Sequence, residues 1–118
     1  MSPRSESERL EDILESIKRI KIAEAKLHTA EKRGQWVSAN TFFDAVLYNL
    51  VVIGEATKSL SLDLRDRNVE VSWKDIAGMR DILTHSYHRV LTKVVMETLD
   101  QPMAVLKKAC ERELGIIE

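Results

Sequence analysis

Residues 5–33 read SESERLEDILESIKRIKIAEAKLHTAEKR, and this stretch decides the fold class. Ser5 followed by Glu8 forms a capping box, which predicts that a helix begins near Ser5, and Gly34 predicts that it ends just before that residue. The first half of the helix is acidic and the second half is basic. This arrangement suits the helix macrodipole, and a basic track for RNA is the alternative. The apolar side chains recur with the period of a helix that buries one face: Leu10, Ile13, Leu14, Ile17, Ile20, Ala23 and Leu27.

A second helix is expected from near Ser38 or Asn40 to about Ser59. Its apolar residues cover more than one face: Phe42, Phe43, Val46, Leu47, Leu50, Val51, Ile53, Ala56 and Leu60. Such a helix must be covered on several sides, either at the centre of a monomer or by a second subunit. We expect a homodimer with this helix in its interface, and the central helix of a monomer is the competing interpretation.

The remaining segments also predict helices. Residues 61–71 are charged and poorly periodic, which indicates a linker or a short helical turn. Ser72 is the expected cap of a third helix, which carries Trp73, Ile76, Met79, Ile82 and Leu83 on its apolar side. A last helical segment from about Thr92 to Leu114 contains Pro102, so it either kinks there or starts anew with Asp100 as its cap. The expected fold is all-α, a four- or five-helix up-and-down bundle in one domain over residues 1–118.

Composition narrows the class of protein. The 118 residues include 18 basic and 19 acidic side chains and a single cysteine, which argues against a disulfide scaffold and against a zinc module. We expect no cofactor and no metal. Near-neutral net charge argues against a basic coat for nucleic acid or a membrane surface, so any RNA contact must come from a local site. Cys110 lies on an apolar stripe and is expected to be a core residue rather than a reactive thiol.

The location of the protein is also an expectation from sequence. The beginning of the chain lacks the apolar stretch of a signal peptide. The longest apolar run, Phe42 to Gly54, falls short of the roughly 20 residues that span a bilayer. We therefore expect a cytoplasmic protein that does not associate with a membrane.

Residues 78–89, GMRDILTHSYHR, concentrate the side chains that could do chemistry. Cleavage of RNA without a metal needs a base, an acid and a cation at the phosphate. His85 suits proton transfer at neutral pH, and the guanidinium of Arg80 matches two phosphate oxygens. An arginine five residues before a histidine is by itself a weak signal, and on a regular helix the two would point about 140° apart. They could converge if the helix ends at a turn near residues 84–86, or if two subunits supply them.

The surrounding residues make this signal more specific. Trp73 lies seven residues before Arg80, the sequence Ile53-Gly54-Glu55-Ala56 stands upstream, and Pro102 lies in the last helical segment. With Arg80, His85 and Tyr87 as its marker, the chain resembles, over essentially its whole length, the HepT-type HEPN family. These proteins are the toxins of HEPN/nucleotidyltransferase toxin–antitoxin pairs.

The resemblance implies a dimeric, metal-independent endoribonuclease. Arg80 and His85 would be catalytic, and Asp81 would be the supporting polar residue after the arginine. The implied partner is a cognate minimal nucleotidyltransferase (MntA-like) antitoxin, which would add AMP units to Tyr87 and so neutralise the enzyme. The substrate would be single-stranded or loop RNA.

Several alternatives stay open. Glu55 could orient the catalytic pair or be a rim carboxylate paired with a nearby lysine, and Tyr87 could simply pack with one hydrogen bond. His88 and Arg89 could add positive potential or be ordinary surface residues. At the level of function, the alternatives are a non-catalytic HEPN module that binds a nucleotide or a partner, and a helical dimerisation scaffold.

Overall fold

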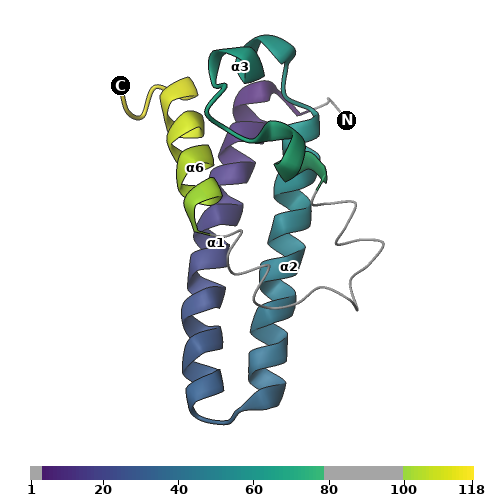
Figure 1. Cartoon of the computed structure of the whole chain (residues 1–118), viewed down its shortest axis with the longest axis vertical. Helices are drawn as coiled ribbons and strands as arrows, with labels where there is room; N and C mark the ends of the chain where they lie inside the picture. Colours follow the sequence, from purple (N-terminus) through teal and green to yellow (C-terminus); the bar gives the residue numbers. More distant parts are fainter. Residues whose placement is uncertain (1–3, 79–99) are drawn as a thin grey trace.

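The computed structural model describes residues 4–78 and 100–118 (Figure 1). Within these ranges the chain is helical and contains no strand, which confirms the predicted all-α bundle. α1 and α2 form a long antiparallel hairpin, α6 lies along the first half of α1, and α3 lies at the end where α1 begins and α2 ends (Figure 1). The bounds are α1 Glu6–Lys32, α2 Trp36–Lys58, α3 Leu62–Arg67 and α6 Gln101–Glu113, and residues 73–78 are helical as well.

The start of α1 confirms the predicted capping box. The Ser5 hydroxyl oxygen accepts a hydrogen bond from the Glu8 backbone N–H at 3.1 Å, and the Glu8 carboxylate accepts one from the Ser5 N–H at 3.0 Å. These two bonds satisfy donors that a helix start otherwise leaves unpaired. They favour the ionised carboxylate and lower the pKa of Glu8 below its usual value.

The turn between α1 and α2 is shorter than expected. Gly34 adopts a left-handed φ of 67°, the conformation that ends many helices and that glycine adopts without steric cost. α2 then begins at Trp36, earlier than the predicted Ser38 or Asn40. Gln35 occupies the capping position without a side-chain hydrogen bond, and its carbonyl accepts from the Ala39 N–H at 2.9 Å. The prediction was wrong because the tight reversal at Gly34 restarts the helix before any capping side chain.

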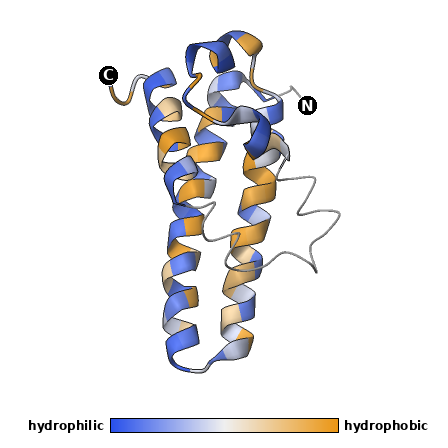
Figure 2. Ribbon diagram, viewed as in Figure 1, coloured by the Kyte–Doolittle hydropathy of each residue, from blue (hydrophilic) through white to orange (hydrophobic). Residues whose placement is uncertain are grey.

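A main apolar core joins the helices, and a smaller cluster of Leu27, Ala30 and Ala39 lies at the Gly34 end of the hairpin. The predicted stripe of α1 is buried apart from Leu14, which is half-buried and packs against the core, and the facing stripe of α2 is buried with it. Figure 2 shows apolar residues gathered on the facing sides of the helices and polar residues on the outside. Core residues with less than 2% of their surface exposed come from the three long helices and from α3, and include Ile13, Val46, Leu50, Ile53, Leu64, Leu106 and Cys110.

α2 is long and apolar enough to cross a membrane by length and composition alone. The run Phe42 to Gly54 therefore underestimated the length of the apolar segment, because the helix that contains this run has 23 residues. A buried core helix passes the same test, and 39% of the most apolar window of α2 is buried inside the domain. Asn49 in its middle is also buried and donates to the Ala45 carbonyl at 2.8 Å. By itself α2 is weak evidence for a membrane.

Residues 61–71 include a short helix, one of the two predicted forms. The Ser61 hydroxyl oxygen accepts from the Leu64 N–H at 3.1 Å and caps α3, and the Ser61 N–H donates to the Glu6 carboxylate at 2.7 Å. The next helical turn starts where predicted, because the Ser72 carbonyl accepts from the Ile76 N–H at 3.0 Å. α3 and the helical residues 73–78 therefore cover the end of the hairpin where α1 begins.

Of the predicted last helical segment, the structure describes α6, and residues 92–99 lie outside the described residues. α6 begins at Gln101 with Pro102 in its first turn and Asp100 in the capping position, although the Asp100 side chain forms no capping hydrogen bond. Cys110 is completely buried, which confirms its predicted core position. The predicted apolar residues Met79, Ile82, Leu83, Val94, Val95, Thr98 and Leu99 lie outside the described residues.

Candidate active site

The marker residues Arg80, His85 and Tyr87 and the supporting residue Asp81 lie in residues 79–99, here called the marker segment, which are outside the described residues. So do His88, Arg89 and the turn predicted near residues 84–86. What the structure describes is the scaffold on both sides of this segment, together with Glu55 on α2.

The chain enters the marker segment from a well-anchored helical turn. The indole N–H of Trp73 donates to the Asn68 carbonyl at 2.9 Å and to the Arg65 carbonyl at 3.2 Å. Ile76 is only 3% exposed and belongs to the main core. A partly buried indole that donates to two carbonyls has a fixed ring orientation, and it also holds the backbone that carries these carbonyls. The backbone seven residues before Arg80 is therefore held against α3 and the core.

The chain leaves the marker segment at α6, which packs on the same core through Met103 and Leu106. A polar link adds to this packing. The Arg67 guanidinium donates to the Glu113 carboxylate at 2.7 Å, and the Asn68 amide donates to the other oxygen of that carboxylate at 3.0 Å. Both bonds favour the ionised carboxylate, so the pKa of Glu113 is lowered.

Asn68 connects the two sides of the marker segment. Its side chain is 2% exposed and bonds α6 through Glu113, while its carbonyl accepts the Trp73 indole N–H. Its amide also donates to the Leu64 carbonyl of α3 at 2.8 Å. Sequence reasoning missed this residue, because an asparagine in a charged, poorly periodic stretch looks like any loop residue.

The upstream sequence Ile53-Gly54-Glu55-Ala56 lies near the end of α2 that adjoins α3. Ile53 is completely buried and Ala56 is 7% exposed, whereas the Glu55 side chain is exposed. An exposed Glu55 agrees with the predicted alternative of a carboxylate at the rim. Its proposed role beside Arg80 or His85 stays a prediction.

Two further observations bear on chemistry. Complete burial raises the pKa of the Cys110 thiol to about 12, as expected for a core cysteine with little nucleophilic thiolate. Within residues 4–78 and 100–118, no three His, Cys, Asp or Glu side chains are grouped so that they could hold a metal ion.

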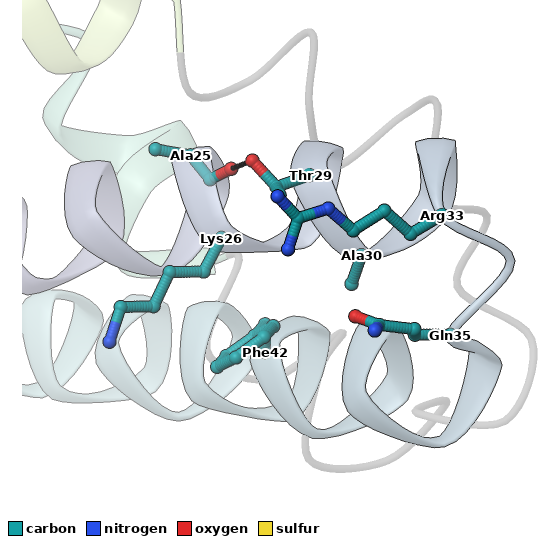
Figure 3. Close-up of a pocket in the computed structure, with 7 residues that line it drawn as sticks. All are labelled: Ala25, Lys26, Thr29, Ala30, Arg33, Gln35 and Phe42. Atoms are coloured by element: carbon teal, nitrogen blue, oxygen red, sulfur yellow. Dashed lines mark hydrogen bonds between the residues drawn. The ribbon is translucent and has the colours of Figure 1, made fainter.

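A second feature lies in the basic half of α1, whose sequence raised a track for RNA as an alternative without indicating a groove. A groove of about 390 Å³ lies between α1 and α2 at the Gly34 end of the hairpin, lined by Lys26, Arg33 and Phe42 among others (Figure 3). The seven-residue spacing of Lys26 and Arg33 on α1, which places them on one face, is the signal that could have indicated it.

Comparison with known proteins identifies the family. The model of the family described as "Ribonuclease HepT-like" matches residues 8–113. The protein named "Probable ribonuclease HepT" from Thermococcus cleftensis is 31% identical over 113 residues, covering 92% of this chain and 96% of that protein.

Shorter matches point the same way. The "Putative RNase TTE0752" of Caldanaerobacter subterraneus subsp. tengcongensis is 41% identical over 64 residues, 54% of this chain and 57% of that protein. The "Putative RNase MJ1216" of Methanocaldococcus jannaschii is 39% identical over 74 residues, 63% of this chain and 61% of that protein. The chain thus spans about three-fifths of the length of these two relatives. No solved structure matches significantly. With a family model that spans nearly the entire chain, this protein belongs to the HepT-like ribonuclease family.

Proposed function

We propose that this protein is a metal-independent endoribonuclease, and that it is the toxin of a HEPN/minimal nucleotidyltransferase toxin–antitoxin pair. The observation that carries the proposal is the family match over residues 8–113, which includes Arg80, His85 and Tyr87 at the marker spacing. The anchored turn at Trp73 and the packed start of α6 support it, because a catalytic segment needs rigid flanks.

In the proposed reaction, a base removes the proton of an RNA 2′-hydroxyl and the 2′-oxygen attacks the adjacent phosphorus. The bond from phosphorus to the 5′-oxygen then breaks, and an acid protonates that oxygen. His85 is suited to either proton transfer, and the permanent charge of Arg80 stabilises the negative charge that develops on the phosphate. Asp81 and Glu55 are assigned supporting roles.

One chain supplies one such histidine, so we propose that a homodimer brings two marker segments to one cleft. Large apolar side chains on α2 support this assembly, because Val37 is 83% exposed and Tyr48 is 66% exposed. Eleven residues apart on a helix, they share one face. Light scattering should give twice the chain mass of 13.5 kDa, and Tyr48→Arg should shift the mass toward the monomer. A monomeric wild-type protein would contradict this assembly.

Tyr87 is the proposed control point. Its phenol oxygen would attack the α-phosphorus of a nucleoside triphosphate held by the partner nucleotidyltransferase, releasing pyrophosphate and giving the phenol proton to solvent. The attached AMP would place negative charge and bulk next to Arg80, and both would oppose RNA binding.

RNA cleavage in the presence of EDTA tests the catalytic part of the proposal. The wild-type protein should cleave a generic single-stranded RNA, and His85→Ala and Arg80→Ala should each lose at least about 100-fold in rate. His28→Ala is the matched control, because this histidine lies exposed on α1, and it should stay within about twofold of wild type. Equal activity of His85→Ala and wild type would refute the catalytic assignment, and no cleavage by any of these proteins would favour a non-catalytic module.

Intact-mass measurement tests the control by modification. After co-expression with a minimal nucleotidyltransferase from the neighbouring reading frame, the protein should gain whole AMP units. Tyr87→Phe should gain none, whereas Tyr48→Phe, which changes the other tyrosine of the chain, should be modified normally. Unchanged masses in all three proteins would exclude this partner.

A further inference from the structure

The distribution of charge along the chain is strongly uneven. Residues 4–17 carry two basic and five acidic side chains, a net charge of −3, whereas residues 18–43 carry six basic and two acidic ones, a net charge of +4. The net charge of −1 for the whole protein hides this contrast. The positive half forms the Gly34 end of the α1–α2 hairpin, which projects beyond α3 and α6 (Figure 1).

The groove described above lies in this positive half. Its wall on α1 consists of Lys26, Thr29 and Arg33, whose spacing of three and four residues places them on one face of the helix. Gln35 and Phe42 line it from the turn and from α2 (Figure 3). The Thr29 hydroxyl is already used, because it donates to the Ala25 carbonyl at 3.1 Å. The donors that remain for a ligand come from Lys26, Arg33 and Gln35.

Both cations are available for an anion. Among the described residues, Lys26 and Arg33 form no ion pair with any carboxylate, and both side chains are exposed. About seven residues of helix separate them, an axial distance of roughly 10 Å. They therefore cannot share one small anion, but they can contact successive phosphates of an extended strand.

An aromatic surface lies beside these cations. The Phe42 ring is half-buried against Leu27, Ala30 and Ala39, which fix its position. The Lys26 ammonium lies 5.9 Å from its centroid, within range of a cation–π interaction. Phe42 lines the groove, whose volume lies at the lower end of the roughly 300–1,000 Å³ typical of small-ligand sites.

We propose that this groove binds one nucleotide unit of a single-stranded RNA. Phe42 stacks on the base, and Lys26 and Arg33 contact the phosphates on its two sides. This combination of a flat aromatic ring and flanking cations is how proteins hold single strands without reading their sequence. The proposal rests on the proposed ribonuclease function, to which it adds a second contact for the substrate, away from residues 80–87.

Binding can be measured without cleavage in the His85→Ala background. Fluorescence anisotropy with a labelled single-stranded oligoribonucleotide of mixed sequence should show roughly tenfold weaker binding when Lys26→Gln and Arg33→Gln are added together. The negative slope of log affinity against log salt concentration should become shallower by about 1.4, because each phosphate contact to a single strand contributes about 0.7 to its magnitude and two contacts are removed. Phe42→Leu should weaken binding at least about fivefold and leave the salt slope unchanged.

The control removes the same charge elsewhere. Lys107→Gln with Lys108→Gln on α6 should change affinity by less than twofold. Circular dichroism establishes that each variant is folded, and the charge variants involve surface side chains only. Equal affinity and equal salt slope for the groove and control variants would overturn the proposal.

Free AMP separates a strand site from a mononucleotide site. It should compete for the groove only at concentrations far above those of the oligoribonucleotide. If the groove variants lose AMP binding but keep RNA binding, the groove is a mononucleotide site and the proposal is wrong. Cleavage by the wild-type protein, measured separately, decides the proposed function whatever the groove variants show.

Discussion

Replacing Trp73 with phenylalanine tests how the candidate active segment is held. The substitution keeps an aromatic ring against the core but removes the indole N–H. Two carbonyls then lose a donor, that of Asn68 at 2.9 Å and that of Arg65 at 3.2 Å. Each carbonyl keeps one backbone hydrogen bond, because the Asn68 carbonyl also accepts from the Val71 N–H and the Arg65 carbonyl from the Asn68 N–H, both at 3.1 Å.

The expected loss follows from these contacts. A hydrogen bond contributes about 0.5–1.5 kcal/mol, and the larger penalty for an unpaired buried group does not apply because both carbonyls keep a backbone donor. Two weakened carbonyls and a smaller ring together give about 2 kcal/mol. An unfolding entropy of about 2.1 cal/mol/K per residue gives roughly 250 cal/mol/K for this chain, so the melting temperature should fall by about 8 °C.

Thermal unfolding followed by far-UV circular dichroism measures this loss at one protein concentration, because oligomerisation would make the melting temperature depend on concentration. Trp36→Phe is the matched control. Trp36 is 64% exposed and its indole has no hydrogen bond within residues 4–78 and 100–118, so the change should stay below about 0.5 kcal/mol. If both variants melt within about 2 °C of wild type, the anchoring role of Trp73 is refuted.

Three further predictions concern stability and reactivity. Ser5→Ala should destabilise the protein by about 1 kcal/mol in urea titration through loss of the α1 cap, and Ser7→Ala, in the same first turn, should have little effect; equal losses would contradict the capping role. Cys110 should not react with a thiol reagent in the native protein and should react fully in denaturant, and rapid native labelling would show that its burial is wrong. Because the folded-state pKa of Glu113 is lowered, the stability that this carboxylate contributes is present above its unfolded-state pKa and is lost as the pH falls through the folded-state value. Wild type should therefore be more stable than Glu113→Gln near neutral pH, with the difference shrinking below about pH 4 in urea titrations at several pH values, and a constant difference would contradict the Arg67 pairing.

The helices that carry their own signals were predictable. α1 combines a strict apolar period with a capping box and a terminal glycine, so local and global preferences agree and both ends are correct to within a residue or two. Pro102 likewise predicted the first turn of α6. The start of α2 was not predictable, because nothing in its side chains marks Trp36 and the boundary depends on how tightly Gly34 reverses the chain.

Glu55 shows the limit of reasoning about a single helix from sequence. Its neighbours Ile53, Gly54 and Ala56 are buried, and the sequence left open both a carboxylate that orients the catalytic pair and an exposed carboxylate at the rim. One residue corresponds to about 100° of rotation, however, so adjacent residues on a helix face different surroundings. Whether Glu55 faces the core or the solvent depends on where α1 and α6 pack, and the sequence of α2 alone does not contain this information.

Asn68 shows why a candidate site can depend on residues that no motif includes. Trp73 orients the chain before the marker segment and Glu113 belongs to the helix after it, yet both bond to this one buried asparagine. A buried amide is costly unless its donors and acceptors are satisfied, so the side-chain bonds of Asn68 tie α3 to α6, while its backbone carbonyl holds Trp73. Substitutions at Asn68 should therefore alter the spacing between the two flanks of residues 79–99 without touching a marker residue. In the proposed ribonuclease, Asn68→Ala should lower the cleavage rate while leaving the mid-point of its pH dependence unchanged, because the titrating group stays in place. A shifted mid-point would mean that Asn68 acts on the chemistry itself.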